Sequence, residues 1–400
     1  MKIHHALHVC SLSSFFQLQQ KAPTCPVRQL QQDVQDAHNK SPFTFKTQMC
    51  ANKYCVYTDE RFWGGRGISF VTTADAIKTP VTQGLERHYR KEVVARVAID
   101  PFEQREIVGK GIGLVAKRFL EKGELIIWEP PSLMVHLDMR DDVPEEQRLA
   151  MQRAAVDALP LKAKSETLGL MGHWGGDPIE DRLDTNSFTV TLEKRMDHHA
   201  LFTQTSRLNH ACRPNCYYLF DRETLTHSVY TIRDVQPGEE LSISYIDPVA
   251  TYAERQEEIR NWGFNCSCFA CMLPVEAREI SDDRIRLIHH YTKELEDWSS
   301  ESCGTPDMAE TLIDMYQDEG LFSNIADGYK LAAHSYSAVR DKYNALRTAN
   351  NAMGYGLQTW KFMGIRMRDV LELMMDPEAH WSWNHRPRTD KDTGLMKEQD

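Results

Sequence analysis

The sequence has no long hydrophobic run and no excess of positive charge, and each absence excludes a class of function. No stretch approaches about eighteen consecutive apolar residues, so we expect no transmembrane helix. The formal net charge is -11, which argues against direct binding to nucleic-acid phosphate and suits a basic protein substrate at least as well. With 400 residues, 41% of them hydrophobic and 26% charged, the chain is typical of a soluble globular protein of roughly two or three domains.

The N-terminus lacks a clean secretory signal. The mildly apolar run 6–16 is interrupted by His8 and by several serines, and polar residues follow it. Thiolates kept for a metal fit a reducing compartment, so we expect a nuclear or cytoplasmic protein. Two of the ten cysteines, Cys50 and Cys55, are close neighbours. They can form a disulfide or stay reduced, and we favour two thiols.

The first ninety residues show two kinds of pattern. Residues 1–40 are rich in Gln, His and Ser without a hydrophobic period, which predicts a disordered N-terminus. Residues 41–92 then read as an extension of strands around 53–57 and 67–73, with a short helix over 73–85. Gly64 and Gly65 mark the turn between these strands.

The central part, 93–250, is β-rich with one helical insertion near 137–180. The helical stretch covers 144–170, and a charged helix over 251–261 follows the last strand. Strands are predicted where β-branched and aromatic residues cluster: 93–99, 111–116, 125–128, 186–192, 217–220, 228–232 and 241–245.

The C-terminal part has helical periodicity. Apolar residues recur at helical spacing from Ile285 to Leu295 and again from Tyr329 to Val339. Residues 274–384 are therefore predicted to form an all-helical domain, a small bundle or a repeat-like stack, although no fixed period is present. The polar tail 385–400 is predicted to be disordered.

A tight cysteine cluster lies just before the helical part. Cys266, Cys268 and Cys271 have the spacing of metal-ligating thiolates, and the segment 251–273 is predicted to bind zinc. Three buried thiols, or a local disulfide beside one free thiol, are the alternatives. Cys212 is the candidate for a fourth ligand, although spacing alone does not separate it from Cys216.

Five motifs follow one another in the sequence: Gly109–Ala116 followed by Lys122–Glu124, Thr185–Phe188, Asn209–Asn215, Gly238–Asp247 and Gly263–Cys271. In this order they resemble the motifs of the SET-domain protein methyltransferases. The resemblance covers roughly residues 93–272 and decides for Cys212 as the fourth zinc ligand. Within the family the chain is similar to the SET/MYND-type subfamily, but residues 130–185 contain no cysteine, so the MYND zinc finger is absent, as in fungal-type SET proteins with a post-SET zinc motif. Ala211 stands at a motif position where the family commonly has serine.

The resemblance implies S-adenosylmethionine as cofactor and Zn²⁺ as structural metal. A glycine-rich turn lets the backbone approach such a ligand closely. Phe264 matches an aromatic residue that packs on adenine, although it could also be a plain core residue beside the zinc. The matching cofactor positions are Lys110, Gly111, Ile112, Gly113, Asn186, Ser206, Asn209, His210, Tyr245 and Phe264.

Tyr245 matches the family's catalytic tyrosine, beside the channel where the substrate lysine meets the methyl group. Methyl transfer is an in-line displacement, so positioning and electrostatics carry most of the acceleration. The attacking amine must be neutral, and desolvation beside a sulfonium lowers its pKa. A tyrosine buried in a strand without a catalytic role is the alternative reading.

The resemblance thus implies an α+β fold with small curved sheets and a protein-lysine N-methyltransferase that acts on a histone or another protein. A catalytically inactive SET fold that serves as a protein-interaction module is the alternative function. We expect a monomer that binds no nucleic acid and no membrane. Residues 65–68 repeat a Gly-x-Gly pattern but lack the rest of the motif, so they are read as a turn. The pairs His198-His199 and His289-His290 are expected on the surface or in loops.

Overall fold

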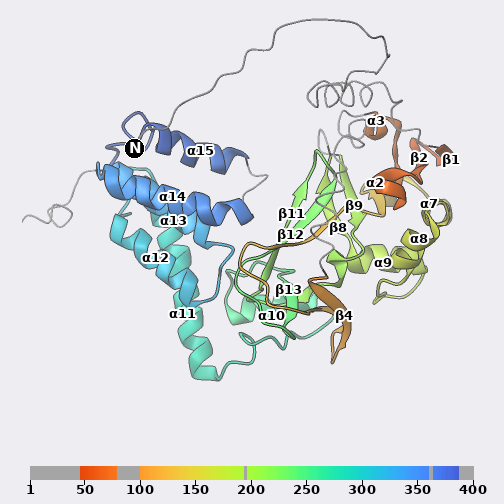
Figure 1. Ribbon diagram of the computed structural model, residues 1–400, viewed down its shortest axis with the longest axis horizontal. Helices are drawn as coiled ribbons and strands as arrows, with labels where there is room; N and C mark the ends of the chain where they lie inside the picture. The colour runs from red at the N-terminus through yellow and green to blue at the C-terminus, as the bar shows by residue number, and fades with distance from the viewer. Residues whose placement is uncertain (1–45, 79–99, 193–195, 360–363, 387–400) are drawn as a thin grey trace, which may run out of the picture. The chain divides into compact units, whose positions relative to one another are not determined.

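A computed structural model describes residues 46–78, 100–192, 196–359 and 364–386 of the chain (Figure 1). The fold is α+β, as predicted, with small sheets in the first part and helices in the last. The predicted disorder of 1–40, the strand at 93–99 and nearly all of the tail 385–400 lie outside the described residues. The predicted domain boundaries remain predictions. No helix in the described ranges has both the length and the apolar character that a bilayer span requires.

The largest sheet joins the N-terminal extension to the middle of the chain. Its strands β3 and β7 pair in parallel, so the extension packs directly on the central β-structure. The segment 65–68 forms the turn between β2 and β3, as predicted, together with the short α2 (Phe62–Gly65). The strand order is β1 (Lys46–Ala51), β2 (Tyr54–Asp59), β3 (Ile68–Thr73), β7 (Leu133–His136), β9 (Asp197–Leu201) and β8 (Phe188–Thr191).

Two predictions about this sheet were wrong. Cys50 and Cys55 form a disulfide instead of staying as thiols, because they stand directly opposite each other in the β1–β2 hairpin. His198 is fully buried in β9, where its Nε2 lies 2.7 Å from Thr72 Oγ1, so it is no surface residue. His289 and His290 are exposed, as expected.

Two smaller sheets hold most of the sequence motifs. Leu114, Ile127 and Val229 belong to the apolar core that their strands share. The predicted strands at 111–116, 125–128, 217–220, 228–232 and 241–245 are confirmed to within two residues. One sheet has the order β10 (Asn209–His210), β13 (Glu240–Ile243), β5 (Gly111–Ala116) and β4 (Phe102–Ile107), and the other β11 (Cys216–Asp221), β12 (Thr226–Thr231) and β6 (Leu125–Glu129).

The helical insertion differs from the prediction at two points. The stretch 144–170 is two helices, because Pro160 has no N–H to donate and disfavours a helical conformation at Leu159. Asn186 ends a helix instead of opening a strand, and β8 begins at Phe188. The helices of the insertion are α6 (Met139–Asp142), α7 (Glu145–Asp157), α8 (Leu161–Leu168) and α9 (Pro178–Asn186). Outside the insertion, α3 (Ala74–Ile77) follows β3, and the 3₁₀ turn η2 (Thr205–Arg207) lies between β9 and β10.

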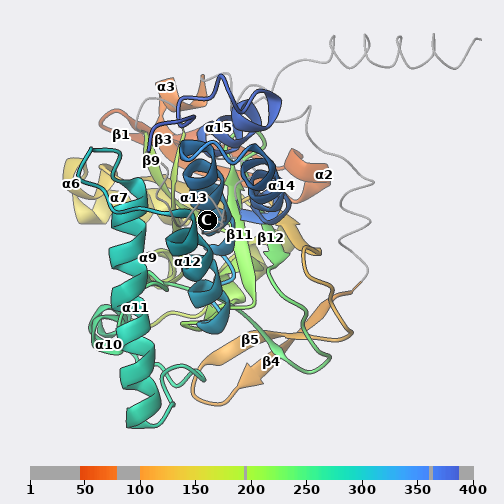
Figure 2. The same ribbon diagram turned by 90° about the vertical axis from the view of Figure 1, so that its left-hand side faces the viewer.

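Residues after 250 are helical, as predicted. A capping box between Thr251 and Glu254 starts α10 (Tyr252–Arg260). Consecutive C-terminal helices pack against one another, and alanines on α13 allow a close approach to α14 (Figure 2). These helices are α11 (Val275–Glu296), α12 (Pro306–Asp318), α13 (Ile325–Ala338), α14 (Lys342–Thr359) and α15 (Gly364–Met375).

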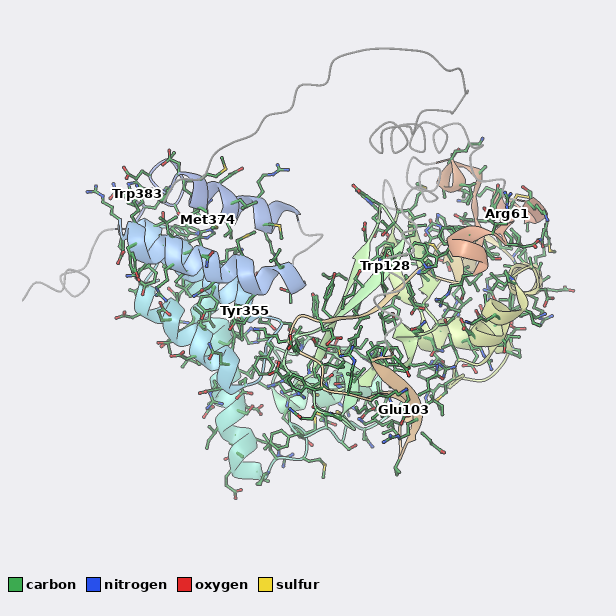
Figure 3. All side chains as sticks on the ribbon, in the orientation of Figure 1. Arg61, Glu103, Trp128, Tyr355, Met374 and Trp383 are labelled. Carbon is green, nitrogen blue, oxygen red and sulfur yellow. A yellow bond between two sulfur atoms is a disulfide. The ribbon has the colours of Figure 1, made fainter. Side chains whose placement is uncertain are left out.

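The C-terminal helices contact the sheets at two places. Arg213 donates to the side chain of Glu319 at 2.7 Å and to its carbonyl oxygen at 2.6 Å, and both side chains are nearly buried. Burial alone would raise the pKa of Glu319, but hydrogen bonds from Arg213 and other donors hold it below its usual value. At the second place the Nζ of Lys122 lies 3.5 Å from the centre of the Tyr355 ring, and both residues line a cavity of about 410 Å³. Tyr355 is labelled in Figure 3.

Candidate active site and metal centre

The predicted glycine turn forms a close junction of three segments. Gly111 has φ +75°, a conformation that favours glycine. A Cβ on Gly113 would lie 2.7 Å from Asn209 Nδ2 and 3.1 Å from Glu240 Oε1, so only a glycine fits without displacing a neighbour. The absence of a side chain here brings β5, β10 and β13 together at one polar point.

Glu240 is the residue that connects this junction, and the sequence analysis did not identify it. Its carboxylate accepts a hydrogen bond from Asn209 Nδ2 at 2.8 Å and pairs with Lys110 Nζ at 2.7 Å. A carboxylate in a predicted strand gives no distinctive sequence signal, so its partners in the structure reveal it. Glu240 therefore joins two predicted cofactor residues from different motifs, and Ile112 beside them is exposed.

A loop between α8 and α9 closes one side of the junction. Met171 Sδ lies 3.2 Å from the position of a Cβ on Gly111, and the carbonyl of Met171 accepts a hydrogen bond from Asn186 Nδ2 at 2.7 Å. The carbonyl of Asn186 in turn accepts from Ser206 Oγ at 2.9 Å. Asn186 and Ser206 thus touch each other and this loop, while the sequence had given no role to Met171.

The same loop contacts the predicted zinc-binding segment 251–273, called the post-SET segment below. A Cβ on Gly263 would lie 2.1 Å from His173 Nε2, so the two loops are in close contact. Asp181 accepts hydrogen bonds from the backbone N–H groups of His173 and Trp174 at 2.9 and 2.7 Å. Burial would raise the pKa of Asp181, but these backbone donors hold it below its usual value, and the carboxylate fixes the loop.

His210 is buried between the catalytic candidate and the cysteine cluster. Its Nδ1 accepts a hydrogen bond from the backbone N–H of Tyr245 at 3.1 Å, which leaves the ring hydrogen on Nε2. That Nε2 faces Cys212 Sγ at 3.3 Å. Burial lowers the pKa of His210 to about 4, so the ring is neutral at pH 7 and links Tyr245 to Cys212.

Tyr245 lies among aromatic rings of the post-SET segment. Its ring centre is 4.9 Å from that of Trp262 and 6.5 Å from that of Phe264, both of which are partly exposed. Its hydroxyl donates to the carbonyl of Leu208 at 2.7 Å. Burial raises the pKa of Tyr245 well above its usual value, so the phenol stays protonated and acts as a donor that positions other groups.

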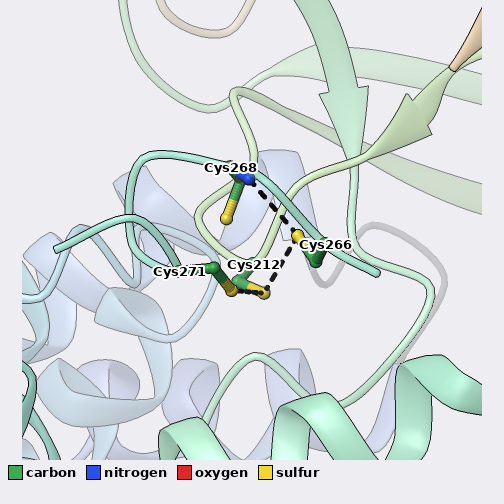
Figure 4. Close-up of side chains that lie close together, drawn as sticks. All are labelled: Cys212, Cys266, Cys268 and Cys271. Atoms are coloured by element: carbon green, nitrogen blue, oxygen red, sulfur yellow. Dashed lines mark hydrogen bonds between the residues drawn. The ribbon is translucent and has the colours of Figure 1, made fainter. Parts of the chain in front are cut away.

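The four predicted zinc ligands come together, and none of them is in a disulfide (Figure 4). All four Sγ atoms lie within 4.8 Å of one another, and Cys212 Sγ is 3.5 Å from Cys271 and 3.8 Å from Cys266. Zn–S bonds of ~2.3 Å in a tetrahedron place the sulfurs ~3.8 Å apart, so the donor set fits Zn²⁺. The local disulfide considered from the sequence is excluded.

The comparisons with known proteins find similarity over the part of the chain that holds these motifs. The SET domain profile matches residues 111–246, so this part of the chain is similar to a SET domain. It is 27% identical over 190 residues to histone-lysine N-methyltransferase set5 of Schizosaccharomyces pombe, which covers 47% of this chain and 56% of that protein. It is 36% identical over 121 residues to histone-lysine N-methyltransferase SET5 of Meyerozyma guilliermondii, covering 30% of this chain and 22% of that protein.

A third relative is from another lineage. The chain is 39% identical over 88 residues to human histone-lysine N-methyltransferase SMYD3, covering 22% of this chain and 20% of that protein. The chain thus spans about half the length of the first of these relatives and about a fifth of the other two.

We expect Cys268→Ser to remove about one equivalent of zinc and to loosen the segment after Trp262. The remaining three thiolates cannot complete a closed tetrahedral site, and structural zinc contributes directly to folding free energy. Elemental analysis and limited proteolysis within residues 262–273 would measure both effects. Cys303→Ser is the control, since Cys303 is an exposed free thiol outside the cluster. Full zinc content in Cys268→Ser would contradict the assignment of Cys268 as a ligand.

Proposed function

We propose that the protein is an S-adenosylmethionine-dependent protein-lysine N-methyltransferase. The observation that carries the proposal is the convergence of the glycine turn, Asn209, Tyr245 and Phe264, from four separate motifs, on one region. The names of the relatives support a histone or another basic protein as substrate. They also support a nuclear or cytoplasmic location, and we propose a monomer with no direct nucleic-acid contact.

The residues fit the proposed cofactor in chemistry and in space. The missing side chain of Gly113 lets Asn209 and Glu240 pack against β5, and Gly111 has the positive φ that favours glycine, so the polar groups of the proposed site are held close to the backbone of the turn. Lys110 and Glu240 offer charges of both signs, as an amino-acid tail requires. Partly exposed apolar side chains suit an adenine and the carbon chains beside a sulfonium: Ile112 and Met171 lie at the glycine turn, and Trp262 and Phe264 lie beside Tyr245. When bound, S-adenosylmethionine supplies an activated methyl group. Asn186 and Ser206 belong to the same proposed cofactor site.

The roles of the chain's own residues follow from the contacts. The protonated phenol of Tyr245, held by its bond to the Leu208 carbonyl, defines one wall of the proposed lysine channel. The Trp262 ring excludes water from that wall and favours the neutral amine that must attack. His210 keeps the backbone of Tyr245 at a fixed distance from the thiolate cluster. Positioning and desolvation are thus the proposed sources of rate acceleration.

The test is methyl transfer from radiolabelled S-adenosylmethionine to a panel of basic proteins and lysine peptides, with calorimetry of cofactor binding. We expect binding and incorporation of label into lysine. Binding without transfer to any substrate would favour the alternative, an inactive SET fold that acts as an interaction module. The proposal would be refuted if the folded, zinc-loaded protein showed no cofactor binding and no methyl transfer. Mass spectrometry of the modified peptides would give the number of methyl groups added.

A further inference from the structure

Three titratable side chains meet inside the C-terminal helices, away from the proposed active site. His334 lies on α13, Asp369 on α15 and His380 in the turn that follows α15. One ligand atom of each lies within 4.8 Å of the others. The three positions are far apart in the sequence, so only the packing of the helices assembles them.

Both imidazoles are buried, and the Nε2 atom of each lacks a well-aligned hydrogen bond. His334 is 4% exposed and His380 is 6% exposed. His334 Nε2 is 2.9 Å from Asp369 Oδ2, and His380 Nε2 is 3.4 Å from Asp369 Oδ1, yet within the described ranges neither Nε2 makes a hydrogen bond of acceptable geometry. A buried polar nitrogen without a well-aligned hydrogen bond is destabilising, and both of these nitrogens face the same carboxylate.

The distances, which end on different oxygens of Asp369, are short enough for a common metal ion as well as for ordinary histidine–carboxylate ion pairs. Metal–N and metal–O bonds of ~2.0–2.2 Å place neighbouring ligand atoms ~2.9 Å apart in an octahedron and ~3.4 Å apart in a tetrahedron. The two Nε2–carboxylate separations of 2.9 and 3.4 Å fall at these values. An ion between the three groups would use the nitrogen lone pairs that hydrogen bonding leaves free.

The groups around the cluster are of the kind that orient metal ligands. The Nδ1 of His380 lies 2.7 Å from Ser382 Oγ, and donation from Nδ1 to this oxygen would leave the Nε2 lone pair for a metal. The backbone N–H of Ser382 donates to the same nitrogen at 3.3 Å, a bond that Nδ1 accepts only when the ring hydrogen is on Nε2, so metal binding would require the other tautomer and the loss of this longer bond. Trp381 Nε1 donates to Asp369 Oδ1 at 2.8 Å and fixes the carboxylate. Each of these two potential ligands thus has an outer partner.

We propose that His334, Asp369 and His380 form a second metal site, for a divalent transition metal of the Zn²⁺ type. Two imidazoles and one carboxylate suit Zn²⁺ and its neighbours in the first transition series, and they do not suit Mg²⁺ or Ca²⁺, which prefer oxygen ligands. The site fastens α13, α15 and the turn after α15 to one another. It contains no thiolate and is independent of the Cys212 cluster.

The experiment measures metal content and uses Co²⁺ as a spectroscopic probe on the full chain. After exposure to excess Zn²⁺ and desalting, we expect Asp369→Asn and His380→Gln each to hold about one equivalent less than the wild type. Asp369→Asn preserves the shape of the side chain and removes its charge. The matched control is His385→Asn, because His385 is an exposed histidine of the same turn region.

Cobalt separates this site from the thiolate cluster. Thiolate-bound Co²⁺ has strong sulfur-to-metal charge-transfer absorption, whereas Co²⁺ held by imidazole and carboxylate has only weak visible bands. We expect Asp369→Asn to lose weak visible absorption and keep the charge-transfer bands, and Cys268→Ser to show the opposite. Equal metal content in wild type, Asp369→Asn and His380→Gln would overturn the proposal and leave the cluster as a buried histidine–carboxylate network. So would a loss of metal in His385→Asn as large as in the cluster variants.

Discussion

Replacing Tyr245 by phenylalanine is expected to slow methyl transfer by about 10²-fold or more, with little change in the stability of the fold. The change removes one oxygen atom, which holds the Leu208 carbonyl at 2.7 Å in the wall of the proposed lysine channel. Losing that hydrogen bond leaves the channel wall less well defined, and small misplacements of reacting groups cost about this much in rate. The aromatic contact with Trp262 stays in place, so the ring continues to exclude water.

Single-turnover kinetics with bound S-adenosylmethionine is the measurement, together with the affinity for the cofactor and the melting temperature. A loss confined to kcat would assign Tyr245 to the chemical step, whereas a change in methylation state would show that it sets the channel volume. Tyr218→Phe is the control, since Tyr218 is a tyrosine of intermediate exposure on β11 outside the proposed site. Unchanged kinetics in Tyr245→Phe would remove the hydroxyl from the mechanism.

Replacing Arg66 by alanine is expected to lower the free energy of unfolding by about 3–5 kcal/mol, because it leaves a buried carboxylate unpaired. Arg66 donates to Glu129 Oε2 at 2.7 Å, and the Glu129 side chain is only 1% exposed. The other oxygen of Glu129 accepts from the backbone N–H groups of residues 204 and 205, at the start of the segment that leads to Asn209. The extension before the SET domain therefore supports the proposed cofactor site.

Urea unfolding with an unchanged m-value would measure this loss. The control is Arg105→Ala, which breaks the ion pair with Glu103 on the exposed face of β4. Exposed ion pairs contribute about 0–1 kcal/mol, so the control should remain close to the wild type. Similar losses in the two variants would mean that Glu129 is stabilised by its backbone donors alone, and that the extension is not needed for the site.

The sequence predicted the parts of the site that depend on local order and on residue type. Asn209 lies against Gly113, and the four thiols cluster, three of them as their spacing indicated and Cys212 as the family resemblance implied. The cofactor and catalytic roles of the motif residues remain predictions. Glu240 was missed because a carboxylate in a strand has no distinctive local pattern. Its importance depends on the parallel pairing of β10 with β13, which is a long-range event.

Other features were out of reach of the sequence for the same physical reason. His334, Asp369 and His380 belong to separate elements, so no spacing rule brings them together. The Cys50–Cys55 pair was misjudged because the choice depends on a hairpin register that leaves the two residues opposite each other. Local propensity was enough to predict most strands and helices. It could not predict the burial of His198, because that depends on the position of β9 between β7 and β8 in the sheet.

The clustering of Cys212 with Cys266 has a consequence for the order in which the chain folds. These sulfurs belong to residues 54 positions apart; β10 ends just before Cys212, and its partner strand β13 lies between the two cysteines in the chain. Contacts between distant residues carry the largest loop-closure entropy and form late. The metal can therefore bind with full affinity only after the sheet exists. A nascent chain short of zinc would hold a formed sheet with an open post-SET segment, so zinc supply would control the last step of maturation more than the first collapse.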